Sequence, residues 1–262
     1  MQIDLRGKRA FVGGASKGIG KATALVLADC GAEIILAARN EEGLQQTLSE
    51  LSTQEGQKHH VFPVDFSQPE QLKKSLEEHA ALFDPIHILV NNAGGPPAGP
   101  LLDANPVDLR IPFNIHVVCN QILTQTFSPT MAREGYGRII NIISTSVKEP
   151  LDHLGVSNTI RGAVGNWAKT MANELGHLGI TVNNVLPGPT ETERLRELTG
   201  EWATKSGKTL DEVMMAMADS TPLKRIAEPS EVANAVAFLA SPAASYITGI
   251  NLPVDGGRTR SL

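Results

Sequence analysis

The chain has 262 residues, which is enough to bury a substantial core without disulfides or a structural metal. Hydrophobic residues make up 41% and charged residues 19%, so the composition excludes a disordered chain. The net charge of −5 argues against a nucleic-acid-binding protein, which would carry a basic surplus. Two cysteines are too few for a disulfide framework and favour a reducing compartment. The sequence shows neither a membrane-spanning run nor a secretory signal, so we expect a cytoplasmic protein.

Short apolar segments alternate with helical segments along the whole chain. Strands are expected at 9–13, 33–38, 60–64, 86–90, 138–143, 180–186 and 250–254. Helices are expected at 19–30, 41–55, 69–82, 107–133, 155–178 and 229–240, with Gly56 ending the second. This alternation predicts an α/β fold with one Rossmann-type, doubly wound parallel sheet and helices on both faces. Because no linker or repeat interrupts the pattern, we predict a single domain over 1–262.

A polar, helical insertion at about 191–221 interrupts the alternation late in the chain. It follows the carboxyl end of a predicted strand, where α/β folds place their ligands. Met214, Met215 and Met217 cluster within it. These methionines either form the core of a helix or give an adaptable apolar surface to a substrate lid. We predict that the insertion is a lid.

A glycine-rich turn, Gly14-Ala15-Ser16-Lys17-Gly18-Ile19-Gly20, joins the first predicted strand to the first predicted helix. Glycine allows backbone angles and close approaches that a Cβ would block. The following helix N-terminus offers free N–H groups and the positive end of its dipole, which suit a pyrophosphate. The turn therefore predicts a dinucleotide site, although its GxxxGxG spacing differs from the GxGxxG of other dinucleotide-binding folds.

Four further motifs occur in a characteristic order after this turn. They are Asn91-Asn92-Ala93-Gly94, Pro187-Gly188-Pro189-Thr190-Glu191-Thr192, the pair PLKR (222–225) and EVA (231–233), and Thr248-Gly249 with Val254-Asp255-Gly256-Gly257. With them the chain resembles the short-chain dehydrogenase/reductase family, most closely its ketoacyl-carrier-protein-reductase-like branch. The resemblance covers nearly the whole chain. It implies an oxidoreductase with a nicotinamide cofactor, a small-molecule substrate and a homo-oligomer, either a dimer or a tetramer.

The resemblance also implies which residues bind the cofactor. Arg39 ends the second predicted strand where NAD-dependent relatives tend to carry an acid. A guanidinium there suits a 2′-phosphate, and Lys17 adds a second positive charge, so we predict NADP(H) over NAD(H). The alternative is that both are solvated surface cations. The expected cofactor-binding residues are Gly14, Ser16, Lys17, Gly18, Ile19, Gly20, Arg39, Asp65, Phe66, Asn92, Ala93, Gly94, Arg161, Pro187, Gly188, Thr190 and Thr192, with Asp65 and Phe66 holding the adenine.

The catalytic positions depart from the family pattern of Asn, Ser, Tyr and Lys. Ser144 follows GRIINII as the family serine follows its strand. In the register of the following helix, Ser157 stands at the tyrosine position and Arg161 at the lysine position. The chain therefore reads SxxxR instead of YxxxK, and its two tyrosines lie elsewhere in the sequence. A serine hydroxyl is a poor proton donor, and Arg161 can bind ribose hydroxyls but stays charged.

The asparagine position has two candidates. Gapless register favours His116, whereas Asn114 would need a two-residue insertion in the helix after it. His116 is expected to titrate near neutral pH and to supply a proton, directly or through a water in the space a tyrosine would fill. His153, four residues before Ser157, is a second candidate if it faces the pocket. No metal-ligand cluster is evident, so we expect no catalytic metal.

Three functions fit these residues. The first is a divergent NADP(H)-dependent oxidoreductase with Ser144, Ser157, Arg161 and His116 at its centre. The second is a catalytically silent NADP(H)-binding or scaffold protein of the same fold, which the loss of Tyr and Lys favours. The third is a dehydratase or isomerase on the same fold, which no sequence feature singles out. We favour the first, without nucleic-acid or membrane partners, and expect it to assemble through the segments 107–133 and 155–178.

Overall fold

Seven parallel strands form one sheet in the computed structural model, which describes residues 3–261. Their order is β3-β2-β1-β4-β5-β6-β7, so the chain reverses its direction across the sheet between β1 and β4. The strands are β1 (Arg9–Gly13), β2 (Glu33–Ala38), β3 (His60–Pro63), β4 (Ile88–Asn91), β5 (Gly137–Ile142), β6 (Ile180–Pro187) and β7 (Asn251–Val254). Ligands in such sheets bind outside the carboxyl ends of the strands, near this reversal. The predicted doubly wound fold is confirmed.

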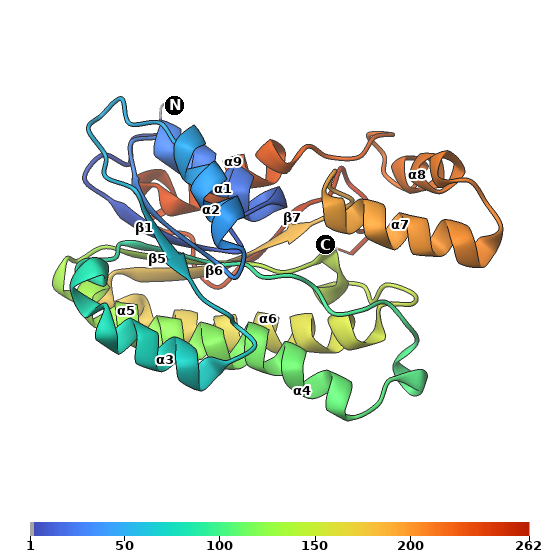
Figure 1. Ribbon diagram of the computed structural model, residues 1–262, viewed down its shortest axis with the longest axis horizontal. Coiled ribbons are helices and arrows are strands. Elements are labelled where there is room, and N and C mark those ends of the chain that lie inside the picture. Colours follow the sequence, from blue (N-terminus) through green and yellow to red (C-terminus); the bar gives the residue numbers. More distant parts are fainter. Residues whose placement is uncertain (1–2, 262) are drawn as a thin grey trace.

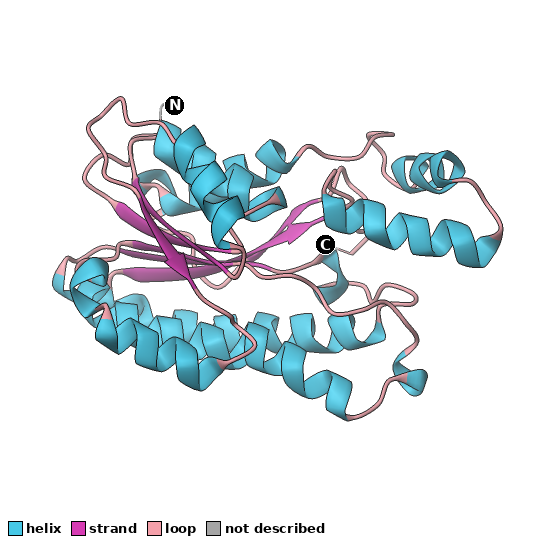
Figure 2. Ribbon diagram, in the orientation of Figure 1, coloured by secondary structure: helices cyan, strands magenta, loops and turns pink. Residues whose placement is uncertain are grey.

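Helices cover both faces of the sheet (Figures 1 and 2). One face carries α1 (Gly18–Asp29), α2 (Glu41–Glu50) and α9 (Pro229–Ala240); the other carries α3 (Pro69–Glu78), α4 (Val107–Phe113), α5 (Cys119–Arg133) and α6 (Gly155–Leu175). Successive strand residues pack into the cores on opposite faces of the sheet, because side chains alternate between the two faces along a strand. Phe11 packs into the α5–α6 core, whereas its neighbour Val12 packs into the α1–α9 core. Burial on both faces explains the continuous apolar runs of the strands.

Helices α2 and α3 end several residues earlier than the sequence pattern predicts. α2 stops at Glu50, because Leu51 already has an extended backbone with ψ of 138°. Gly56, expected to end this helix, lies instead in the following turn with φ of 77°. The carbonyl of Ser52 contacts Nε2 of His59 at 2.8 Å, which fixes the segment after α2 next to the start of β3. α3 likewise ends at Glu78, and a short 3-10 turn, Ala80–Phe83, completes the expected helical segment.

The predicted helix 107–133 is continuous in path but changes its winding in the middle. A π-helical turn, Asn114–Val118, separates α4 from α5. Pro112, just before it, lacks the N–H that would bond the preceding turn, which weakens the regular hydrogen-bond ladder. Single π turns of this kind occur often at functional sites. This turn holds His116 in a buried position.

The insertion folds as two helices, α7 (Glu193–Ser206) and α8 (Leu210–Asp219), that extend beyond β7 (Figure 1). Thr192 caps α7, and Thr209 forms a capping box with Glu212 at the start of α8. α8 buries none of its side chains, and Met215 is 67% exposed. The interpretation as helix core is wrong for Met215, whereas Met214 and Met217 are half-buried on a helix that contacts little beyond α7. Within residues 3–261, no helix is long and apolar enough to cross a membrane.

Candidate active site

The glycine turn lies between the end of β1 and the start of α1, against the loop that follows β4. A Cβ on Gly20 would lie 2.2 Å from the carbonyl oxygen of Gly14, and one on Gly14 would lie 2.6 Å from Nδ2 of Asn92. That amide donates to the carbonyl of Gly13 at 3.0 Å. The turn therefore has no room for side chains at these two glycines, which leaves the backbone open for a close approach of phosphate.

The segment after β6 meets the same turn. A Cβ on Gly18 would contact Cγ2 of Thr192 at 3.4 Å. Thr190 Oγ1 donates to the carbonyl of Gly188 at 3.0 Å, and Gly188 packs so closely against Asp255 that a Cβ would lie 2.7 Å from its Cα. The structure thus gathers most of the expected cofactor-binding residues at the carboxyl edge of the sheet: Gly14, Ser16, Gly18, Ile19, Gly20, Asn92, Ala93, Gly94, Pro187, Gly188, Thr190 and Thr192.

Arg39 and Asp65 lie next to each other beyond β2 and β3. Nε of Arg39 is 4.0 Å from Oδ1 of Asp65, and the arginine side chain is 75% exposed. Asp65 also accepts the backbone N–H of Ser67 at 2.9 Å. Phe66 is half-buried, and its carbonyl accepts the thiol of Cys119. Arg39 is therefore loosely held beside the expected adenine site and can turn toward a phosphate.

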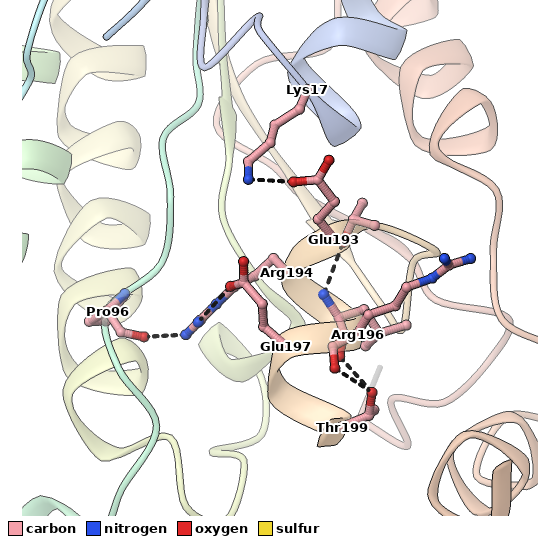
Figure 3. A network of polar contacts seen from close by, with 9 residues as sticks. Lys17, Pro96, Glu193, Arg194, Arg196, Glu197 and Thr199 are labelled. Atoms are coloured by element: carbon pink, nitrogen blue, oxygen red, sulfur yellow. Dashed lines mark hydrogen bonds and ion pairs between the residues drawn. The ribbon is translucent and has the colours of Figure 1, made fainter. Parts of the chain in front are cut away.

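Lys17 is held by the insertion, a contact that the sequence pattern does not reveal. Its Nζ lies 2.6 Å from Oε2 of Glu193, the first residue of α7 (Figure 3). This hydrogen bond holds the pKa of the Glu193 carboxyl below its usual value. Arg194 beside it donates from Nη2 to the carbonyl of Pro96 at 2.6 Å. The start of α7 is therefore tied both to the glycine turn and to the loop after β4.

A small cavity of about 10 Å³ lies beneath this edge, on the α5–α6 side of the sheet. His116 and Arg161 line it together with Asn91, Asn92 and Ala93. The guanidinium of Arg161 is buried and donates from Nη1 to the carbonyl of Ile142 at 3.0 Å. Burial lowers its pKa to about 10, so it is charged at neutral pH. Across residues 3–261, no carboxylate lies within ion-pair distance of it.

His116, and not Asn114, reaches this cavity. Its Nε2 donates to the carbonyl of Gly94 at 3.1 Å, which leaves Nδ1 as an acceptor. Burial and the neighbouring charge of Arg161 hold the pKa of His116 well below its usual value. The expectation that His116 titrates near neutral pH is therefore wrong, because the imidazolium would be desolvated beside another cation. His153, the second candidate, is exposed and does not line the cavity.

Ser144 and Ser157 are both half-buried beside this edge. Ser144 follows the end of β5, and its Oγ accepts the backbone N–H of Ser146 at 3.1 Å. That bond leaves its hydroxyl proton free for another acceptor. Ser157 lies in the first turn of α6, four residues before Arg161, so the two share one helix face. The residues at the expected tyrosine and lysine positions therefore point to the same side of α6.

Sequence reasoning missed a ladder of four asparagines: Asn91, Asn141, Asn184 and Asn251. Their side-chain amides are joined in series by three hydrogen bonds of 2.8 Å. The sequence does show an asparagine in each of four apolar strand segments. Their pairing, however, depends on the order of the strands in the sheet. The part of the chain that the structure describes holds no group of three His, Cys, Asp or Glu side chains arranged for a metal ion.

Comparison with known proteins places this site in a family. A family model described as enoyl-(acyl carrier protein) reductase matches residues 14–259. The 3-oxoacyl-[acyl-carrier-protein] reductase FabG of Vibrio cholerae is 35% identical, over 97% of this chain and 98% of its own length. The 7alpha-hydroxysteroid dehydrogenase of Escherichia coli is 30% identical, over 99% of this chain and 97% of its own length.

A solved structure agrees with these sequence relatives. L-Sorbose reductase from Gluconobacter frateurii, complexed with NADPH and L-sorbose, superposes with a TM-score of 0.93 and 31% identity, and each chain is covered completely. These relatives are oxidoreductases, and the solved one binds a nicotinamide cofactor and a small molecule. The family match and the shared fold lead to one conclusion: the chain belongs to the short-chain dehydrogenase/reductase family.

Proposed function

We propose that this chain is an NADP(H)-dependent oxidoreductase that moves a hydride between nicotinamide and the carbonyl or alcohol of a small molecule. The glycine turn carries the proposal, because it excludes side chains at Gly14 and Gly20 and contains Lys17. The N-terminus of α1 would hold the pyrophosphate, and Lys17 and Arg39 the 2′-phosphate. Asp65 and Phe66 would hold the adenine. NADPH in the complex of the L-sorbose reductase supports this choice.

The remaining residues would serve the reaction itself. When bound, the cofactor supplies or accepts the hydride. Arg161 would hold the nicotinamide ribose, and the free hydroxyl proton of Ser144 would bond the substrate oxygen. His116 is neutral and donates to Gly94, so it positions that loop rather than acting as an imidazolium acid. A water held by Ser157 would then pass a proton to the substrate oxygen and take another from solvent, in the space that a longer tyrosine side chain would fill.

We further propose that α7 and α8 form a substrate lid on a single domain that spans the chain. The exposed Met215 of α8, with the half-buried Met214 and Met217, would give it an adaptable apolar surface. A homo-oligomer, dimer or tetramer, would form through α5 and α6. Sedimentation at micromolar concentration is expected to show a species larger than the monomer, and a monomeric profile would contradict this assembly.

Substitution of Arg39 tests the cofactor preference. Fluorescence titration should show tighter binding of NADPH than of NADH to the natural chain. Arg39→Ala should raise the NADPH dissociation constant about tenfold and leave that of NADH within about twofold, because only NADPH carries the 2′-phosphate. Arg6→Ala, at another exposed arginine, is the matched control and should change neither. Equal losses for both nucleotides would contradict the role of Arg39.

Glu193 is expected to lower the affinity for NADPH, because its carboxylate pairs with the Lys17 ammonium that would otherwise bind the 2′-phosphate. Glu193→Gln removes a negative charge 2.6 Å from the Lys17 ammonium, so the lysine becomes free for the 2′-phosphate. NADPH should bind about two- to fivefold more tightly at low salt, and less so as salt screens the charge. Glu197→Gln, one turn further along α7 and paired with Arg194, is the control. Unchanged NADPH affinity in Glu193→Gln would place Lys17 away from the phosphate.

The silent-protein alternative is supported by SxxxR standing in place of YxxxK. A chain that binds NADPH but reduces no carbonyl substrate would favour it over the oxidoreductase. Turnover of any ketone or sugar with consumption of NADPH would exclude it.

A further inference from the structure

The asparagine ladder crosses four neighbouring strands in register. Asn91 on β4 stands opposite Asn141 on β5, which stands opposite Asn184 on β6 and then Asn251 on β7. Nδ2 of each donates to Oδ1 of the next at 2.8 Å. The first three side chains are buried. Such a row places aligned polar groups inside the sheet, among strand residues that are mostly apolar.

The three bonds all run in the same direction. Each amide therefore points its nitrogen toward β7 and its oxygen toward β4, so the dipoles add along the row and polarise one another. The row ends at Oδ1 of Asn91, which is buried and has no hydrogen-bond partner among residues 3–261. An unmatched buried amide oxygen is costly, so a positive group or a donor is expected to face it.

Arg161 is the buried positive group that lines the same cavity as Asn91. Leu89, two residues before Asn91 on the same strand face, packs into the core beneath α5 and α6, so Asn91 faces the helices that include Arg161. Asn91 and Arg161 line the same cavity. Arg161 is buried with one carbonyl partner, Ile142, and no carboxylate within ion-pair distance in the described chain. Burying a lone charge is strongly unfavourable unless dipoles compensate it.

We propose that Asn91 is a positioning residue whose Oδ1, at the negative end of the ladder, acts as the uncharged counterpart of the buried Arg161 guanidinium. It acts across their shared cavity, which has room for about one water molecule. Asn91 thereby holds Arg161 in the orientation that the cofactor ribose needs. The link to cofactor binding rests on the proposed function, whereas the pairing of amide and guanidinium does not.

A double-mutant cycle on stability tests the pairing. Urea unfolding is measured for the natural chain, Asn91→Leu, Arg161→Met and the double variant. Asn91→Leu should lower the folding equilibrium constant about tenfold more in the natural background than in the Arg161→Met background, because only the former leaves a lone buried charge. If Asn91→Leu lowered the folding equilibrium constant by the same factor, within about twofold, in the natural and the Arg161→Met backgrounds, the pairing would be overturned.

Asn184→Leu is the matched control. Asn184 is a buried ladder residue two strands from Asn91 and does not line the cavity. Its substitution breaks ladder bonds without removing the oxygen that faces Arg161. Asn184→Leu should lower the folding equilibrium constant by the same factor, within about twofold, in the natural and the Arg161→Met backgrounds. Coupling to Arg161 as large as that of Asn91 would show general weakening of the sheet and overturn the assignment.

Asn91→Asp keeps the test decisive if Asn91→Leu fails to fold. A carboxylate facing Arg161 forms an ion pair, but in the Arg161→Met background it is buried alone. Asn91→Asp should therefore lower the folding equilibrium constant at least about tenfold more in the Arg161→Met background than in the natural background. Equal losses in the two backgrounds would overturn the proposal.

NADPH titration adds the functional readout. Asn91→Leu should raise the NADPH dissociation constant about fivefold, and should raise it no further once Arg161→Met is present. Additive losses would overturn the positioning role. A natural chain that binds no NADPH would refute the proposed function instead, while the stability cycle would still decide whether Asn91 and Arg161 are paired.

Discussion

Replacing Gly20 with alanine is expected to abolish tight binding of nicotinamide nucleotides. The added Cβ would lie 2.2 Å from the Gly14 carbonyl oxygen and 2.7 Å from Nδ2 of Asn92, so the backbone of the glycine turn must move. The shift misplaces the N–H groups meant for the pyrophosphate, which should weaken NADPH and NADH alike by about a hundredfold. Overpacking of this kind also lowers the free energy of unfolding by about 1–3 kcal/mol. Fluorescence titration and urea unfolding measure the two effects.

Gly162→Ala is the matched control for this substitution. Gly162 lies in α6, and a Cβ there meets nothing within 4 Å. Alanine is the better helix former, so this variant should be more stable by about 0.5–1 kcal/mol and should bind NADPH unchanged. If Gly20→Ala bound both nucleotides as the natural chain does, the turn would be scaffold only, and the silent-protein alternative would gain.

The sheet could be predicted from sequence because its signals are local. β1 and β2 begin and end at the predicted residues, since a strand buried on both faces is a short apolar run between turns. The end of α2 was missed by five residues. There the polar residues after Leu51 continue a helix-like pattern, and only the contact of His59 with Ser52 shows that the chain has already turned. Tertiary contacts, rather than propensity, set such boundaries.

The glycine turn could be predicted for the same local reason, because its glycines are adjacent in the chain. The contacts that the polar and charged residues make could not be predicted from the sequence. Lys17 meets Glu193, which lies 176 positions later, and the asparagine ladder exists only once β4, β5, β6 and β7 are neighbours. The charge state of His116 was missed because its pKa depends on burial and on Arg161, neither of which is visible in the sequence. Residue types indicate chemistry, but protonation follows from three-dimensional surroundings.

Those surroundings give His116 a large and measurable pH effect. The native imidazole stays neutral well below the usual pKa of 6.5, because burial and then the Arg161 charge disfavour its protonation. The unfolded chain takes up this proton near pH 6.5, so it binds more protons than the native chain in the acidic range. The stability contribution of neutral His116 is thus complete above pH 6.5. It is lost as the pH falls toward the native pKa, at up to about 1.4 kcal/mol per pH unit.

His116→Gln should remove this loss. Between pH 6.5 and pH 5, urea unfolding should show a decline in stability that is smaller than that of the natural chain by up to about 2 kcal/mol. His87, at the opposite end of the strands, also has a lowered pKa, chiefly through burial, so it adds a second acid-sensitive contribution. His87→Gln is the comparison, and the double variant should show a flatter decline than either single one. An unchanged acid-side decline in His116→Gln would mean that the native imidazole protonates as freely as the unfolded one, and His116 would return as a candidate proton donor.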